Sequence, residues 1–532
     1  MAREGCVVWR ILVRALLVAG WVSFVKPAAH AFRLEWQGKR LEVGVAASVR
    51  EVLEENRSTQ RERTQGKLRL SPRMDWSKNF RLAASVSGMV GGPTMLARRG
   101  GVLHWRKVFQ NRSPAVDFEE VYVDASWRSL DLRLGKQRVA WGKLDRFSPV
   151  DVFNSLAYFD PFLVEEGERR IGIPAVSVTY SAPSTGWFTD PRFTAIWAPL
   201  FVPYRFADAR CRLVDSVKSV CEAERWFPPA AVPPPSFVIP EGALPMPGGG
   251  LSPSMAVPLS FQVRNEAPRA TLRDGSFGAR LGATVWNTDV AGYYYRGYDP
   301  QAAFSFRAWA TGLPDPNPAN PLRVKNLAGH TFLQPAFKSI DLVGFDAAQS
   351  RGDFVFRAEA AFISGRPYVR EVRSLLSESP AFAGEVLRAL QDLARGAGAT
   401  PVVLPEASVT RNAVEWGVGM DYQFHGWLLI LQLNQTNLLN NDAETRLLIR
   451  DVETRSFLTL RKNFLSERLR TNLQGGYGID SSYVFARPRF TYQWNDWLSS
   501  EVGYLLIAGR RRSVVGQYRR NDEGWVSLSV RF

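Results

Sequence analysis

Cysteine and histidine are scarce in this sequence, and their scarcity excludes whole classes of site. The 532 residues include 3 Cys and 4 His. No two cysteines form a CxxC pair, and the histidines beyond residue 31, His104, His330 and His425, lie far apart. Zinc and haem sites need ligands at short, regular spacings. We therefore expect no metal site, and we expect no other cofactor.

Long apolar runs are also missing beyond residue 31. A spanning helix needs about 20 apolar residues, and the apolar run at residues 15–25 is too short for one. Three arginines precede this run, and an Ala-His-Ala sequence ends at residue 31. This order is typical of a secretory signal peptide with its cleavage site. We predict that residues 1–31 are removed and that residues 32–532 are exported.

Two of the three cysteines remain in the mature chain. Cys6 precedes the apolar run and leaves with the signal peptide, whereas Cys211 and Cys221 lie in one segment with nine residues between them. Exported proteins mature in an oxidising compartment, where neighbouring thiols pair. We predict a disulfide between Cys211 and Cys221, and two free thiols are the alternative.

What the chain does contain is a series of segments with alternating polarity. Residues 67–76 place Leu68, Leu70 and Trp76 on one face and charged side chains on the other. A second such segment begins at Phe80, so the short polar link between them is a hairpin turn. Segments of about ten residues with a period of two are the signature of a transmembrane β-barrel.

The same hairpin unit recurs eight times. Its turns are expected near residues 77–79, 128–129, 184–190, 287–289, 349–352, 425–426, 466 and 495–496. One further strand at each end, residues 41–49 and 524–532, brings the total to eighteen. We predict an all-β protein, a single antiparallel transmembrane barrel with short periplasmic turns and long extracellular loops. Sixteen strands is the alternative if residues 41–49 or the hairpin around Phe457 are misread.

Two of the long links differ from the others. Residues 206–273 hold both cysteines and a proline-rich stretch, which disfavours ladder hydrogen bonds. This link is either a surface linker or a constriction that folds inward. Residues 365–411 contain a predicted short helix, with Ser379 as its cap, Pro380 in its first turn and Gly396 at its end. That helix would either narrow the mouth or shield the rim.

The last nine residues match the end of an outer-membrane barrel. Val526, Leu528, Val530 and Phe532 alternate with polar residues, and the aromatic residue comes last. Outer-membrane barrels commonly end in this pattern, which the barrel-assembly machinery recognises. We therefore expect these four residues to be an assembly signal and the protein to reside in the bacterial outer membrane.

Several stretches resemble a known family. They are LRLGKQRVAWGK from Leu132, GYYYRGYDP from Gly292, FRAEAAF from Phe356 and SSEVGYLLIAG from Ser499. In these stretches the chain resembles the porin-like family that includes the alginate-export barrels. The resemblance implies an eighteen-stranded barrel whose positively charged lumen passes acidic solutes. The cysteine pair and the proline-rich link depart from the family pattern and leave the solute open.

If one face of each strand meets lipid, the opposite face lines the lumen. The basic candidates for the pore lining are Arg69, Arg73, Arg81, Arg133, Lys136, Arg138, Arg280, Arg357, Arg470, Arg487 and Arg489. The acidic candidates are Asp75, Glu120, Asp124, Asp131, Glu359, Glu415, Asp421 and Glu501. These charges either pair to hold the barrel together or leave a basic ladder, built from Arg133, Lys136, Arg138, Arg487 and Arg489, for acidic solutes.

We therefore expect a channel for passive passage or export of small or polymeric solutes, with a preference for anions. The formal net charge of +16 includes basic loops at residues 61–63 and 510–520, which suit lipopolysaccharide phosphates. Nucleic acid is not an expected partner. A non-conducting scaffold or surface receptor is the first alternative. A hydrolase is a weaker one, because no mature histidine lies in a predicted strand and no GxSxG motif occurs.

Overall fold

The computed structural model describes most of the chain. The described residues are 32–36, 39–56, 59–90, 116–157, 166–202, 209–213, 219–223, 236–239, 255–263, 275–301, 303–317, 324–370, 380–404, 406–441, 447, 449–511 and 513–532. The expected signal peptide, most of the proline-rich stretch and the capping residue Ser379 lie outside them. Among the described residues, no helix is long and apolar enough to cross a bilayer.

The main sheet is a closed antiparallel barrel. It has nineteen strands, of which β1 (Phe32–Trp36) pairs only with β2, so that eighteen close the wall. These eighteen are β2 (Lys39–Asn56), β3 (Thr59–Ser77), β4 (Phe80–Val90), β5 (Val116–Trp127), β6 (Leu130–Gln137), β7 (Ile173–Ser181), β8 (Phe188–Ala198), β13 (Ser276–Val285), β14 (Thr288–Tyr298), β17 (Ser339–Arg351), β18 (Phe354–Val369), β20 (Ser408–Phe424), β21 (Trp427–Leu439), β22 (Val452–Phe464), β23 (Leu469–Gly478), β24 (Tyr483–Gln493), β25 (Leu498–Gly509) and β26 (Glu523–Arg531). The predicted eighteen-stranded barrel is confirmed.

The alternating sequence pattern separates the two faces of the wall. On β14, Tyr293 and Tyr295 are 5% and 1% exposed, whereas Tyr294 between them is 37% exposed. The pleat turns successive side chains to opposite faces. One tyrosine in this run therefore lies on the outer surface, and its two neighbours pack inside.

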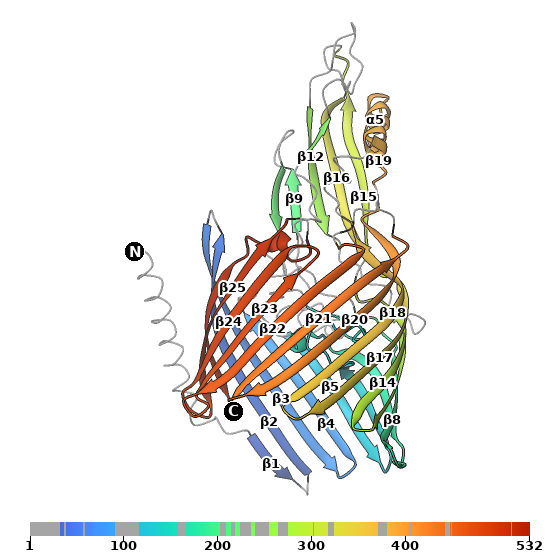
Figure 1. Cartoon of the computed structure of the whole chain (residues 1–532). Coiled ribbons are helices and arrows are strands. Elements are labelled where there is room, and N and C mark those ends of the chain that lie inside the picture. The colour runs from blue at the N-terminus through green and yellow to red at the C-terminus, as the bar shows by residue number, and fades with distance from the viewer. Residues whose placement is uncertain are drawn as a thin grey trace, which may run out of the picture.

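Hairpin turns join consecutive strands at one end of the barrel (Figure 1). Each of the eight expected hairpins is an antiparallel pair in the structure. Several turn residues have the left-handed backbone that a tight turn requires, such as Asn287 with φ 64° and Gly426 with φ 75°. We call this end the tight-turn end and the opposite end the mouth.

Three long connections at the mouth build a second sheet. Its strands are β9 (Ala209–Leu213), β10 (Ser219–Ala223), β11 (Ser236–Ile239), β12 (Met255–Val263), β15 (Ala303–Pro314), β16 (Val324–Ala336) and β19 (Ala399–Val402). Helix α5 (Pro380–Ala394) packs on β15 and β19, and its Leu390 and Leu393 belong to an apolar cluster with Val257 of β12 and Val324 of β16. The sheet stands beyond the mouth of the barrel (Figure 1). The short helices α3 (Glu166–Arg169) and η5 (Gly516–Tyr518) complete the described elements.

The base of this second sheet reaches across the mouth. Leu333 of β16 is 1% exposed and belongs to an apolar cluster with Phe457 of β22, Phe485 of β24 and Leu505 of β25. The hairpin β15–β16 leaves the barrel between β14 and β17, several strands away from β24. The hairpin therefore extends over the lumen to the opposite wall.

The second sheet corrects one premise of the sequence analysis. That premise placed no mature histidine in a strand, yet His330 lies in β16. The sequence did not reveal β16, because its residues, VKNLAGHTFLQPA, lack the alternation of polar and apolar side chains that marks the barrel wall and include a proline near the end. His330 lies in the second sheet, not in the barrel wall.

The register of β9 and β10 is compatible with the predicted disulfide, which stays a prediction. Cys211 and Cys221 are direct partners across this antiparallel pair. The Cα atoms of such partners are about 4.5–5.5 Å apart, within the range that a disulfide bridges. We expect mass spectrometry of the unreduced exported protein to find the peptides that contain Cys211 and Cys221 joined, and reduction to separate them. Alkylation of both thiols without reduction would contradict the prediction.

His330 makes the second sheet sensitive to pH. Its ring bonds the hydroxyls of Ser260 on β12, at 2.9 Å, and Thr311 on β15, at 3.0 Å. Burial disfavours the charged imidazolium and lowers the pKa of His330 below its ordinary value of about 6.5. The unfolded chain therefore takes up the proton first, so the stability of this sheet is complete above about pH 6.5 and decreases as the pH falls below it.

Hydrogen exchange measured by mass spectrometry checks this expectation. Amides of β12, β15 and β16 should exchange faster at pH 5 than at pH 7.5, after correction for the intrinsic exchange rate, whereas barrel strands such as β21 should not change. The variant His330→Gln removes the titrating group and should abolish the difference. A difference of the same size in that variant would assign it to another group.

Candidate solute path through the barrel

One connection folds into the barrel instead of out of it. It joins β6 to β7, and we call its described residues, 138–157 and 166–172, the inner segment. Trp141 and Phe153 pack edge to face, with ring centroids 4.7 Å apart. They belong to an apolar cluster with residues of the inward faces of β7, β8, β14, β17 and β18. Burial of this cluster drives the connection against one side of the lumen.

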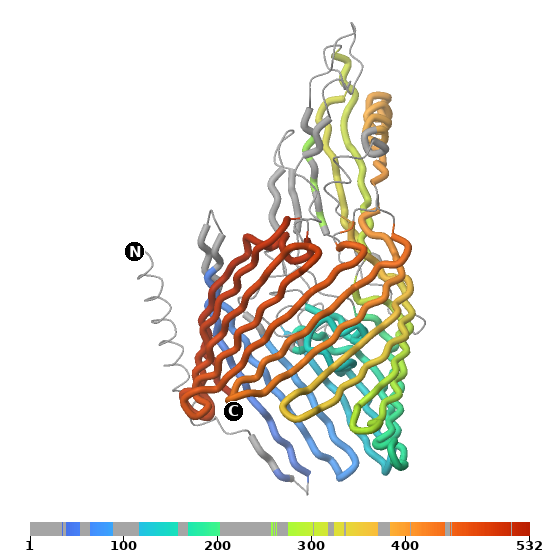
Figure 2. The backbone as a smooth tube through the Cα atoms, viewed as in Figure 1, coloured from blue at the N-terminus to red at the C-terminus, as the bar shows by residue number. Residues whose placement is uncertain are grey.

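Polar wall residues hold the tip of the inner segment on the opposite side. Gln432 of β21 accepts hydrogen bonds from the backbone N–H groups of Asp145, at 3.2 Å, and Arg146, at 3.3 Å. The Arg146 guanidinium donates to the side chain of Gln474 on β23 at 2.9 Å. Contacts that run from β7 around to β23 are possible only inside the barrel, so the inner segment crosses the bore (Figure 2).

Glu359 of β18 is the centre of this anchorage. Its carboxylate accepts hydrogen bonds from the backbone N–H of Lys143, from the N–H of Leu144 at 2.6 Å and from the Ser148 hydroxyl at 2.5 Å. The chain turns tightly around it at Gly142, where φ is +82°. A Cβ atom at Gly142 would lie 2.6 Å from Glu359 Oε1. Only glycine combines this backbone angle with so close an approach.

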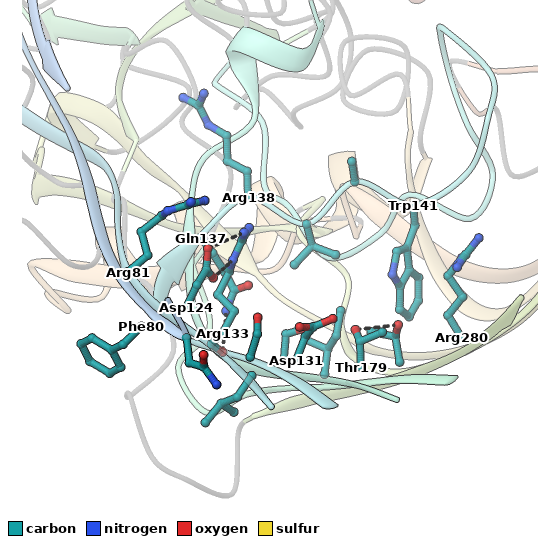
Figure 3. A pocket seen from close by; sticks show the side chains of 18 of the residues that line it. Phe80, Arg81, Asp124, Asp131, Arg133, Gln137, Arg138, Trp141, Thr179 and Arg280 are labelled. Atoms are coloured by element: carbon teal, nitrogen blue, oxygen red, sulfur yellow. Dashed lines mark hydrogen bonds and ion pairs between the residues drawn. The ribbon is translucent and has the colours of Figure 1, made fainter. Parts of the chain in front are cut away.

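Below the inner segment, toward the tight-turn end, lies a cavity of about 580 Å³ (Figure 3). Its lining comes from β3–β8, β13, β14 and β17 and from residues 138–143 of the inner segment. The charged residues that line it are Lys78, Arg81, Arg133, Arg138, Lys143, Arg280, Asp75, Asp124, Asp131 and Asp346. Six cations against four carboxylates give the cavity a modest excess of positive charge.

Most of the sequence-predicted charges lie in pairs. Arg81 pairs with Asp75 at 2.6 Å, Arg133 with Asp124 at 2.6 Å, Lys136 with Asp117 at 3.5 Å, Arg69 with Glu119 at 2.8 Å, Arg138 with Glu119 at 3.4 Å and Arg489 with Glu501 at 3.8 Å. Arg357 pairs with Asp421 and, at 2.8 Å, with Asp145 of the inner segment. Glu415 pairs with Arg366 at 2.9 Å, and Glu120 accepts the N–H of Arg138 at 2.9 Å.

The remaining candidates are distributed differently. Arg487 is 2% exposed and donates to Gln474, so it belongs to the anchorage of the inner segment. Arg280 and Asp131 line the cavity. Arg73 and Arg470 lie on β3 and β23 and are not part of its lining. In the proposed basic ladder, Arg133 and Arg138 line the cavity, whereas Arg487 contacts Gln474 on another part of the wall. The inner segment links the two groups, because its Arg146 also binds Gln474. The sequence did not reveal this link.

Several residues of this site were missed. Sequence analysis placed a possible constriction in residues 206–273, whose described strands belong instead to the second sheet. It overlooked Lys143 and Arg146, together with the wall residues Asp346 and Gln432. One signal was present: the apolar residues of VAWGKLDRFSPVDVF, from Val139 to Phe153, follow no period of two and are too many for an exposed loop.

Removal of the Glu359 carboxylate should loosen the inner segment. Glu359→Ala leaves three donors without their acceptor, at a cost of about 1–3 kcal/mol for each one that stays buried. We expect a lower midpoint of urea unfolding and faster trypsin cleavage after Lys143 or Arg146. In Asp190→Asn, which removes one partner of an exposed pair with Arg192, neither measurement should change appreciably. Equal behaviour of the two variants would contradict the anchoring role.

Comparison with known proteins gives a family and distant structural similarity. A family model described as "Protein of unknown function (DUF1302)" matches residues 21–500. Solved structures similar to this chain include OccAB2 of Acinetobacter baumannii, with 8% identity over 92% of this chain and 98% of that chain and a TM-score of 0.41. OpdK of Pseudomonas aeruginosa with vanillate shows 7% identity over 92% and 98%, also with a TM-score of 0.41.

A third similar structure is OmpF of Salmonella typhi in complex with daunomycin, with 9% identity over 94% of this chain and all of that chain and a TM-score of 0.36. No curated protein matches the sequence. Because the family model covers most of the sequence, the chain belongs to the family of proteins of unknown function DUF1302.

Proposed function

We propose that this protein is an outer-membrane channel for the passive passage of small solutes, in which the inner segment forms the constriction. The observation that carries the proposal is the combination of a closed eighteen-stranded wall with a charged cavity beneath a segment that crosses the bore. A barrel of this size needs internal chain to narrow its lumen. The wall and the constriction are the two parts that a selective channel requires.

The outer surface of the wall supports placement in a membrane. Large apolar side chains are exposed there, among them Leu281, Val343 and Phe345, each at least half exposed. Tryptophans gather toward the tight-turn end, where Trp127 and Trp286 adjoin the turns and are 51% and 74% exposed. An apolar band with aromatic residues at its edge matches a barrel surrounded by lipid. Export by the predicted signal peptide and insertion by the barrel-assembly machinery through Val526–Phe532 remain part of the proposal.

The charges of the cavity support a preference for anions. Its lining has two more cationic than acidic side chains. A low-dielectric wall concentrates the field of such an excess along the bore. The preference should be modest, because most of these arginines face carboxylates at hydrogen-bonding distance.

The anchorage of the inner segment supports small solutes over polymers. Its tip is held by Glu359 on one strand and by Gln432 and Gln474 on two others, so the bore is subdivided. A polymer of the alginate type would have to displace this tip. We therefore propose a channel for small acidic solutes, with lipopolysaccharide as a surface partner of its basic loops.

A surface receptor or scaffold is the second candidate, and the second sheet with α5 is the observation that favours it. A folded unit at the mouth could bind a ligand without any conduction. We propose no catalytic role: hydroxyls occupy both ring nitrogens of His330, and among the described residues no carboxylate contacts the ring to orient it as a base toward Ser260. Conductance separates the channel from the receptor.

Recording from the purified protein in planar lipid bilayers tests the channel. We expect stepwise conductance and, under a tenfold gradient of potassium chloride, a reversal potential of the sign that indicates chloride preference. Liposomes that contain the protein should swell faster in small carboxylates than in amines of the same size. Absence of any conductance would favour the receptor, and a cation-selective reversal potential would remove the anion preference alone.

A further inference from the structure

Arg280 differs from the other arginines of the cavity. Arg81, Arg133 and Arg138 each pair with a carboxylate. In the described part of the chain, Arg280 has no such partner: its Nε donates to the hydroxyl of Tyr293 at 3.1 Å, and its guanidinium carbon lies 5.7 Å from the centre of that ring. It lies on the opposite side of the cavity from Arg81 (Figure 3). Its two terminal nitrogens are thus available to a ligand.

Gly282 leaves the space that this guanidinium occupies. A Cβ atom there would lie 2.9 Å from Nη1 and 3.0 Å from Nη2 of Arg280. The side chain therefore lies along the inward face of β13, over Gly282. The guanidinium is held through its Nε by Tyr293, and Arg280 is part of the cavity lining.

The Tyr293 hydroxyl links Arg280 to the inner segment. Besides the Arg280 Nε, it accepts the backbone N–H of Gly142 at 3.4 Å, and it donates to Asp346. Asp346 is fully buried and pairs with the Lys143 ammonium at 3.1 Å. Gly142 and Lys143 belong to the tip that Glu359 anchors. One hydroxyl therefore contacts the cavity arginine, the inner segment and the carboxylate that holds Lys143.

We propose that Arg280 is the residue that selects anions in the cavity, that its ligands are small monocarboxylates, and that Tyr293 couples their binding to the inner segment. This inference rests on the proposed function. The free edge of a guanidinium matches the two oxygens of a carboxylate. A single unpaired arginine suits one negative charge better than two, because the other arginines of the cavity already pair with carboxylates.

The coupling follows from the shared hydroxyl. A carboxylate bound to Arg280 fixes the guanidinium, and with it the Tyr293 hydroxyl that holds Gly142 and Asp346. Occupancy therefore stabilises the anchored position of the inner segment. Since coupling between two sites is reciprocal, release of the inner segment weakens carboxylate binding by the same factor.

Isothermal titration calorimetry of the full mature chain in detergent, with benzoate as the probe, tests the selection. Benzoate should bind, and benzyl alcohol, which lacks the charge, should not. Arg280→Gln should lower the affinity for benzoate at least tenfold. Arg133→Gln removes the same charge from the same cavity and should lower it by less than threefold. Arg280→Lys keeps the positive charge but loses the planar guanidinium that donates two parallel hydrogen bonds to a carboxylate. Its affinity for benzoate should lie between those of Arg280→Gln and the parent protein.

Tyr293→Phe tests the coupling, since it leaves every charge in place. We expect a threefold to tenfold loss of benzoate affinity together with faster trypsin cleavage at Lys143 or Arg146. In the parent protein benzoate should slow that cleavage, and in Tyr293→Phe it should not. Strand content by circular dichroism confirms that each variant has folded. Benzoate protection of the same size in Tyr293→Phe would overturn the coupling.

The results separate this inference from the channel itself, because calorimetry needs no conduction. If benzoate binding depends on Arg280 but the protein shows no conductance, the proposed channel function is wrong and the proposed role of Arg280 in anion binding is supported. If conductance is normal but Arg280→Gln and Arg133→Gln bind benzoate with equal affinity, the selecting role of Arg280 is wrong and the channel function is supported. No binding of benzoate to the parent protein would also overturn the selection.

Discussion

The constraint on which the structure depends is the pairing of every backbone N–H and C=O group in the barrel wall. In lipid an unpaired group has no water to bind, so an open sheet edge is not tolerated. The pairing of β26 with β2, from Ala46 opposite Arg531 to Glu54 opposite Glu523, removes the last two edges. Closure of the wall creates the lumen, and the lumen in turn determines where the polar faces of the strands and the long connections can go.

A lumen enclosed by eighteen strands is too wide for the wall side chains to fill, and the β6–β7 connection occupies part of it. The two sides of the wall hold this connection by different means. Residues of β7, β8 and β14 offer an apolar surface to Trp141 and Phe153, whereas Glu359 and Gln432 offer hydrogen-bond acceptors to its turn. The inner segment is thereby fixed in position as well as buried.

The charges of the lumen act mainly on one another. Arg133 and Asp124 form two hydrogen bonds, and Lys136, with a side chain that is fully buried, pairs with Asp117. Such pairs organise the wall, because a buried charge without a partner is costly. The preference for anions then depends on the few charged groups that have no partner of opposite charge. A count of all arginines in the lumen therefore overestimates this preference. Arg280 stands out for this reason rather than for its charge alone.

The sequence by itself determined the strands of the barrel wall, their hairpin turns and their number, because each depends on neighbours in the chain. A period of two marks the wall, as at Tyr293, Tyr294 and Tyr295, and short polar links mark the hairpins. The tertiary structure decided the site. Ser148 meets Glu359 across 211 residues, and Arg146 meets Gln474 across 328. Such contacts leave no local pattern, because they exist only once the closed wall brings distant strands around one lumen.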